Sequence, residues 1–190
     1  MSNAYSELVA RISGGEALTR DEAQSLLSTE DGQDFALIEA ASALRRQEFR
    51  NVIAIHTEDE ELAEALGTRS ISIDSYEILD ISQDIDSHEL ADRMVALGAG
   101  KPTGITVKLP QQAVPMMLMR ILSVLRLSAP DKVIHLPEGY EESLRSLASL
   151  AMHIVSAITI TDDIERWPLV NETLKALRHG GVVLDASGLG

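Results

Sequence analysis

Cysteine is absent from this 190-residue chain. Without a thiol the protein cannot form disulfides, zinc–thiolate centres, cysteine nucleophiles or thiolate-held iron–sulfur clusters. Histidine and carboxylate side chains are the remaining candidates for metal binding. We therefore expect no resident cofactor, and we assign no metal ligands.

Long apolar runs are also missing, because no stretch approaches the ~20 residues that a membrane-spanning helix needs. The first residues, Met1 to Glu7, lack the basic segment and apolar core of a secretory signal. The sequence therefore predicts a cytoplasmic protein that does not enter a membrane.

Basic residues are scarce in the first half of the chain. Residues 1–100 contain 7 Lys and Arg against 21 Asp and Glu, a net charge of −14, whereas residues 101–190 contain 9 of each. Such a surface repels phosphate backbones and anionic lipids, so nucleic acid and membrane are not expected partners. The acid is compatible with a basic protein partner, or it simply keeps the protein soluble.

The first 50 residues are predicted to be helical. Helices are expected at 6–12, at 23–27 behind a capping box at Thr19–Glu22, and at about 35–49, where Leu37, Ala40 and Leu44 recur at helical spacing. Arg45 lies where a positive charge favours the end of that third helix.

From residue 51 onward, short β-branched runs alternate with helical stretches. Strands are expected at 52–56, 70–74, 77–81, 105–109, 133–136, 154–160 and 182–184. Helices are expected from about 57 to 67 and 87 to 97, and near 115–127, 141–151 and 168–178, with Ser87 as one cap. This alternation predicts parallel strands that are joined by helices. The length allows five or six strand–helix units in one α/β domain, as an incomplete barrel or an open parallel sheet with an N-terminal helical extension.

Two stretches of the chain resemble a known family. They are residues 15–23, with Leu26, Leu27 and 43–45, and residues 130–141, with the leucines that follow. The first is similar to the N-terminal helical region of biotin-synthase-like radical S-adenosylmethionine enzymes, and the second to a late strand and loop of their barrel. The resemblance implies a shortened barrel-like fold.

The departures from that family concern its catalytic residues. The family binds its cluster with Cys-x3-Cys-x2-Cys after the first strand, where this chain has residues 56–61, His-Thr-Glu-Asp-Glu-Glu. His135 and Tyr140 stand where the biotin synthases have arginines, although Gly139 and Glu141 agree. The resemblance therefore implies a relative without the cluster, and no catalytic residue is transferred.

Ligands of parallel α/β folds bind at the carboxyl ends of the strands. The polar residues expected there are His56, Thr57, Asp74, Lys108, His135, Thr161 and Asp162. His56, Asp74 and His135 are the candidate catalytic residues, since two imidazoles and a carboxylate can perform acid–base or metal-assisted chemistry. Strand-end residues that merely meet solvent would show the same pattern. Lys108 is a candidate for Schiff-base chemistry, or it is simply a lysine exposed to solvent at a strand end.

The predicted helix near 115–127 is apolar on nearly every side, which is typical of a helix that is covered all round. Either the helices of residues 1–50 pack on it or a second subunit does, in a homodimer or a hetero-complex. The candidate interface residues are Met116, Met117, Leu118, Met119, Ile121, Leu122 and Leu125.

Two functional hypotheses follow. The first is a non-catalytic accessory subunit, related to the radical enzymes, that docks through this helix on itself or on an active radical enzyme. The second is a small-molecule enzyme that uses the strand-end His and Asp side chains.

Overall fold

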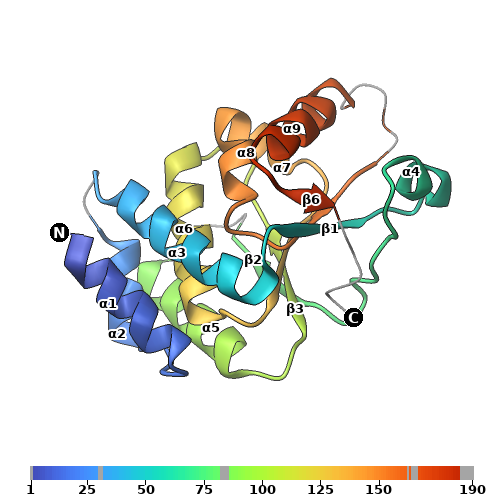
Figure 1. The fold of residues 1–190 in the computed structure, drawn as a ribbon. Helices are drawn as coiled ribbons and strands as arrows, with labels where there is room; N and C mark the ends of the chain where they lie inside the picture. Colours follow the sequence, from blue (N-terminus) through green and yellow to red (C-terminus); the bar gives the residue numbers. More distant parts are fainter. Residues whose placement is uncertain (1, 30–31, 82–85, 162, 164–166, 185–190) are drawn as a thin grey trace.

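A computed structural model describes residues 2–29, 32–81, 86–161, 163 and 167–184. Six parallel strands form one sheet in the order β2-β3-β4-β5-β1-β6 (Figure 1). The strands are β1 (Val52–His56), β2 (Glu77–Asp80), β3 (Gly104–Lys108), β4 (Val133–Leu136), β5 (Ala157–Thr159) and β6 (Val183–Leu184). The expected α/β class is confirmed, and the sheet is open rather than closed into a barrel.

Most helices begin and end within a few residues of the predicted limits. They are α1 (Ser2–Ser13), α2 (Arg20–Leu27), α3 (Asp34–Phe49), α4 (Glu60–Ala65), α5 (Ser87–Ala99), α6 (Pro115–Ser128), α7 (Tyr140–Leu144), α8 (Ala148–Ala151) and α9 (Trp167–His179). The capping box of Thr19 and Glu22 is present. The cap of α5 is Asp86 rather than Ser87, because its carboxylate accepts two backbone N–H bonds.

Two predicted elements differ from the structure. The segment 70–74 was expected to be a strand, but only Ser70 bridges to Ile55 of β1, and residues 71–76 run across the sheet rather than along it. The helix expected over 141–151 is divided into α7, a 3-10 turn (Arg145–Leu147) and α8. Arg145 has a positive φ of 52°, which a continuous right-handed helix does not allow.

The helical face of the sheet, defined here by the alternate residues Ile53, Ile55, Ile105, Val107 and Ile158, packs into the main core. Helices α5, α6, α7, α8 and α9 contribute side chains to this core, as do α1, α2 and α3 of the N-terminal extension, and Ala63 of α4 is also buried in it. Figure 1 shows these helices gathered on one side of the strands. The extension therefore packs over the helical layer and leaves the carboxyl ends of the strands uncovered by α1 to α3.

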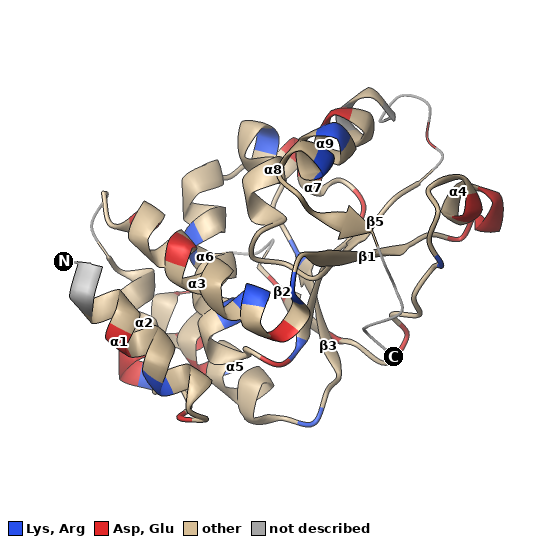
Figure 2. Ribbon diagram, viewed as in Figure 1, with Lys and Arg blue, Asp and Glu red and all other residues tan. Residues whose placement is uncertain are grey.

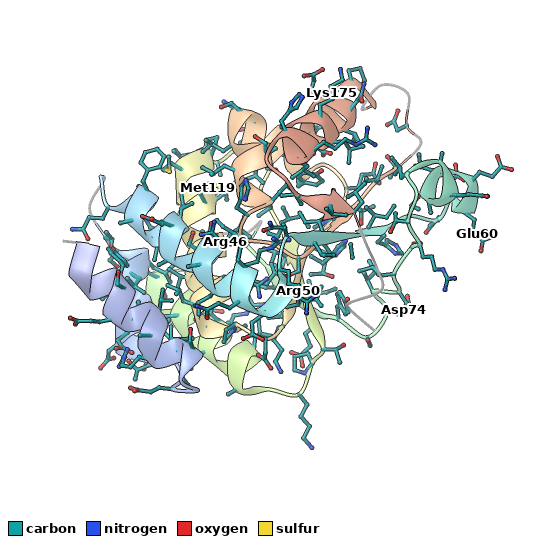
Figure 3. All side chains as sticks on the ribbon, in the orientation of Figure 1. Arg46, Arg50, Glu60, Asp74, Met119 and Lys175 are labelled. Carbon is teal, nitrogen blue, oxygen red and sulfur yellow. The ribbon has the colours of Figure 1, made fainter. Side chains whose placement is uncertain are left out.

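Helix α6 is the apolar helix noted in the sequence, and α3, α5 and α2 pack around it. Of the seven candidate interface residues, Leu118, Met119, Ile121, Leu122 and Leu125 are buried inside this chain (Met119 is labelled in Figure 3). Met116 is partly buried and Met117 is 45% exposed. The N-terminal helices thus account for most of the apolar surface, and a subunit interface at α6 stays a prediction.

Two fully buried arginines connect the helices to the amino ends of the strands. Arg45, predicted to favour the end of α3, instead donates to the backbone oxygens of Val155 (3.0 Å), Arg50 (2.9 Å) and Val52. Arg126 donates to the oxygens of residues 129, 130, 132 and 154 and to the Ser156 hydroxyl, and its guanidinium lies over the Phe49 ring. Burial lowers the pKa of Arg126 to about 9, so it remains charged at neutral pH. The two side chains donate hydrogen bonds to buried backbone carbonyl groups near the starts of β1, β4 and β5.

Candidate functional site

The second face of the sheet carries small and polar side chains, and we call it the crossover face. Its residues alternate with those of the helical face: Ala54, His56, Gly104, Thr106, Val133, His135, Ala157 and Thr159. Residues 71–76 cross it, and Ile71 and Tyr76 pack on its apolar centre. Tyr76 fits because residue 104 is glycine: a Cβ there would lie 2.6 Å from the Tyr76 ring.

The chain order creates a topological switch between β5 and β1. After β5 the chain continues to α9, which packs in the main core on the helical face. After β1 it passes through α4, which lies beyond the end of the strand (Figure 1) and buries Ala63 in the main core. It then returns as residues 70–76, of which Ile71 and Tyr76 pack on the crossover face. Neighbouring strands whose connections leave toward opposite faces separate at their carboxyl ends, and open α/β sheets bind ligands in the resulting crevice.

A cavity of about 700 Å³ lies at this switch point. Its lining comes from the ends of β1 and β5, the start of α4 and the loop after β4: His56, Thr57, Glu58, Asp59, Glu60, Glu61, Glu138, Thr159, Ile160 and Thr161. This volume suits a small molecule. Thr57 and Thr161 were predicted to lie at strand ends and do line the cavity, whereas Asp162 falls outside the described residues.

Among the described residues, the cavity lining contains five carboxylates and neither Lys nor Arg. Part of this acid serves α4, because Asp59 caps the helix by accepting from the backbone N–H groups of Glu61 and Leu62. Figure 2 shows the acidic side of α4 beyond the end of β1. Whatever their local role, these carboxylates give the cavity a negative potential, which disfavours anionic ligands.

His56 is the ionisable residue of β1 that lines the cavity. Its Nδ1 lies 2.8 Å from the backbone oxygen of Ile71. A carbonyl oxygen only accepts, so Nδ1 carries the proton in this contact, and the neutral ring keeps its lone pair on Nε2. Within the described part of the chain, Nε2 has no hydrogen-bond partner. His56 therefore offers a proton acceptor whose tautomer is set by the backbone.

His135 lies next to His56 but inside the sheet. The two ring centroids are 6.2 Å apart, and Tyr76 contacts the His135 ring edge to face at 6.3 Å. His135 is fully buried and does not line the cavity. Burial, with a smaller contribution from His56, lowers its pKa to about 4, so the ring is neutral at pH 7.

Asp74, the third candidate catalytic residue, is not brought to these histidines. It lies exposed in the crossing segment, where its carboxylate accepts a hydrogen bond from the Ser72 hydroxyl at 3.0 Å (Figure 3). The described residues contain no group of three or more His, Cys, Asp or Glu side chains arranged for metal binding. The catalytic role of the three residues stays a prediction.

Lys108 lies at the end of β3 in a separate cavity of about 340 Å³, between the loop after that strand and α7. The lysine side chain is exposed rather than desolvated, which does not favour Schiff-base chemistry. Thr106 and Thr159, which bond to His135, were not recognised in the sequence. Their only signal is their alternation with buried neighbours, and threonine is common in strands.

None of the described helices has the length and apolar character of a membrane span. No protein-family model matches this chain, and no curated protein sequence matches it significantly.

Proposed function

We propose that this chain binds a small polar molecule in the cavity between β1 and β5 and uses His56 for acid–base chemistry on it. The observation that carries the proposal is the coincidence of the cavity with the switch point of the sheet, with the Nε2 lone pair of His56 at its wall. General bases are most often histidines whose pKa lies near the working pH.

The negative charge of the cavity lining indicates which class of ligand it favours. Because the described lining residues include five carboxylates and no Lys or Arg, a neutral or positively charged molecule is favoured over an anion. Three four-carbon probes separate these classes: 1,4-diaminobutane, 1,4-butanediol and succinate. Backbone amide NMR shifts at residues 56–61 and 159–161 should respond to the diamine and the diol, and not to succinate.

The groove between α1 and α2, about 630 Å³ in volume, provides an internal comparison because it includes Tyr5 and Leu8 but none of the strand ends. Responses confined to that groove, or a preference for succinate, would contradict the proposed site.

Catalysis is tested separately from binding by the pair His56→Asn and His179→Asn. Asparagine can keep the donor to Ile71 but lacks Nε2, and His179 is exposed at the end of α9. A bound compound with an acidic C–H bond should take up deuterium from D₂O with the wild type and with His179→Asn. Uptake that persists unchanged in His56→Asn would exclude His56 as the base.

A second proposal is that the chain is a non-catalytic accessory subunit of a radical enzyme. It is supported by the absence of cysteine and by two exposed apolar side chains at the start of α6, Val114 (65%) and Met117 (45%). The test is co-purification from the native host with a cysteine-bearing radical enzyme, repeated with Met117→Glu. Recovery of the chain alone in both cases would count against it.

A further inference from the structure

A chain of hydrogen bonds crosses three strands of the crossover face and ends at the cavity. The Nδ1 atom of His135 lies 3.1 Å from the Thr106 hydroxyl, and its Nε2 lies 2.9 Å from the Thr159 hydroxyl. Thr159 lines the cavity and His135 does not. Hydrogen bonding therefore connects His135 to the cavity through Thr159.

The neutral state of His135 restricts how these bonds are directed. A neutral imidazole carries one N–H and one lone pair, so one of its two threonine partners must donate and the other must accept. A protonated ring would donate to both, but burial disfavours that form.

The burial of Thr106 decides between the two arrangements. Thr106 is only 8% exposed in the sheet. Among the described residues, the hydrogen-bond partner of its hydroxyl is His135. A buried hydroxyl proton needs an acceptor, and Nδ1 supplies one only if it is unprotonated. Nε2 then carries the ring proton and donates to the Thr159 oxygen. The Thr159 hydroxyl proton is left to donate toward the cavity.

Beside the Thr159 donor, His56 offers a hydrogen-bond acceptor to the cavity. Its Nδ1 donates to Ile71, so its Nε2 accepts. His56 and Thr159 are Cα partners in the register of β1 and β5, and both line the cavity. An acceptor and a donor thus lie on neighbouring strands, each oriented by a group outside the cavity.

We propose that His56 and Thr159 form a donor–acceptor pair that recognises a carboxamide group of the ligand, with His135 as the positioning residue that orients Thr159. The amide NH₂ donates to Nε2 of His56, so the amide N–H is the proton that His56 would accept in this complex, and the amide oxygen accepts from Thr159. A carboxylate would bring an oxygen lone pair against Nε2, and an amidinium would bring a proton against the Thr159 proton. The inference rests on the proposed binding site and specifies its ligand class.

The first experiment needs no ligand. Side-chain ¹⁵N NMR of the full chain at pH 7 should show His56 protonated on Nδ1 and His135 protonated on Nε2. His135 protonated on Nδ1, or doubly protonated, would overturn the positioning role.

The second experiment uses three probes of equal size: benzamide, benzoate and benzamidine. Benzamide should bind at the cavity, and Thr159→Val should raise its Kd about fivefold, as expected for one neutral hydrogen bond. Thr159→Ser should restore the wild-type Kd, whereas benzamidine binding should not change in either variant. Equal effects on all three probes would reduce Thr159 to a packing role and overturn the proposal.

His135 is tested by Gln and Leu substitutions, with far-UV circular dichroism to confirm folding. Gln retains a donor near the Nε2 position, so benzamide should bind nearly as in the wild type, whereas Leu should cost as much as Thr159→Val. If Leu does not fold, the tautomer measurement on the wild type still decides. Absence of benzamide binding overturns the carboxamide assignment, while the diamine and diol titration reports independently whether the cavity binds ligands.

Discussion

Acid should destabilise this protein through His135, because its ring is buried as the neutral form. The folded-state pKa is about 4 against an ordinary value of 6.5. Between these values the unfolded chain binds a proton that the folded chain does not, so stability present above pH 6.5 is lost as the pH falls toward 4. The two pKa values give a loss of ~2.5 kcal/mol between pH 7.5 and pH 4.5.

The groups that face His135 are the hydroxyls of Thr106 and Thr159, the Tyr76 ring and the His56 ring. Of these, His56 is the one whose charge opposes protonation of His135, and it adds to the effect of burial. The stability that His135 costs the protein at low pH therefore comes mainly from the removal of its ring from water on folding.

The assay is urea denaturation of the wild type and of His135→Gln at both pH values. Carboxylates titrate in the same range, so the informative quantity is the difference in pH dependence between the two proteins. His135→Gln should be less stable at pH 7.5 by ~1 kcal/mol for its imperfect hydrogen bonds, but should lose ~2.5 kcal/mol less on acidification. The exposed His179, as His179→Gln, serves as the matched control.

Equal pH dependence of the wild type and His135→Gln would refute the reasoning. It would mean that the ring is solvated in the folded state, so that neither of its hydrogen bonds would have a fixed direction.

Four further substitutions test the packing and the predicted interface. Arg126→Met should destabilise the fold by ~3 kcal/mol or more in urea denaturation, because four backbone oxygens and the Ser156 hydroxyl lose their donor; a loss below ~1 kcal/mol would contradict this. Gly104→Ala should cost ~1–3 kcal/mol in the same measurement by displacing Tyr76, and an undiminished cost in a Tyr76→Ala background would show another cause. Leu118→Glu should cost ~3 kcal/mol or more by burying a charge, whereas Met117→Glu should change folding by less than ~0.5 kcal/mol and dissociate any oligomer seen by light scattering. A monomeric wild type at micromolar concentration with no recovered partner would count against an interface at α6.

The local elements could be predicted because their signals are local. The capping box at Thr19 and the β-branched runs of β1 and β4 act within a few residues, so alternation of helix and strand followed from them. The segment 70–74 was mistaken for a strand because Ile71 and Ile73 alternate with polar residues, a pattern that also suits a chain packed on one side against a sheet.

The candidate site was predictable in part. His56 follows a buried strand, and the rule that ligands meet the carboxyl ends of strands placed it correctly at a cavity. The same rule placed His135 and Asp74 beside it, although one lies inside the sheet and the other on an exposed segment. Thr159 was not predicted, since its role depends on partners 24 residues away on β4 and across the register on β1.

The sequence by itself determined that this is an acidic, cysteine-free α/β chain of parallel strands and helices, because composition and hydrophobic period act residue by residue. The strand order, with β1 inserted between β5 and β6, was decided by tertiary packing, as was the covering of α6 by α3. That order places the connections of β1 and β5 on opposite faces and so creates the cavity. The tautomers inferred for His56 and His135 likewise depend on a backbone oxygen and on hydroxyls that only the folded sheet brings within hydrogen-bonding distance.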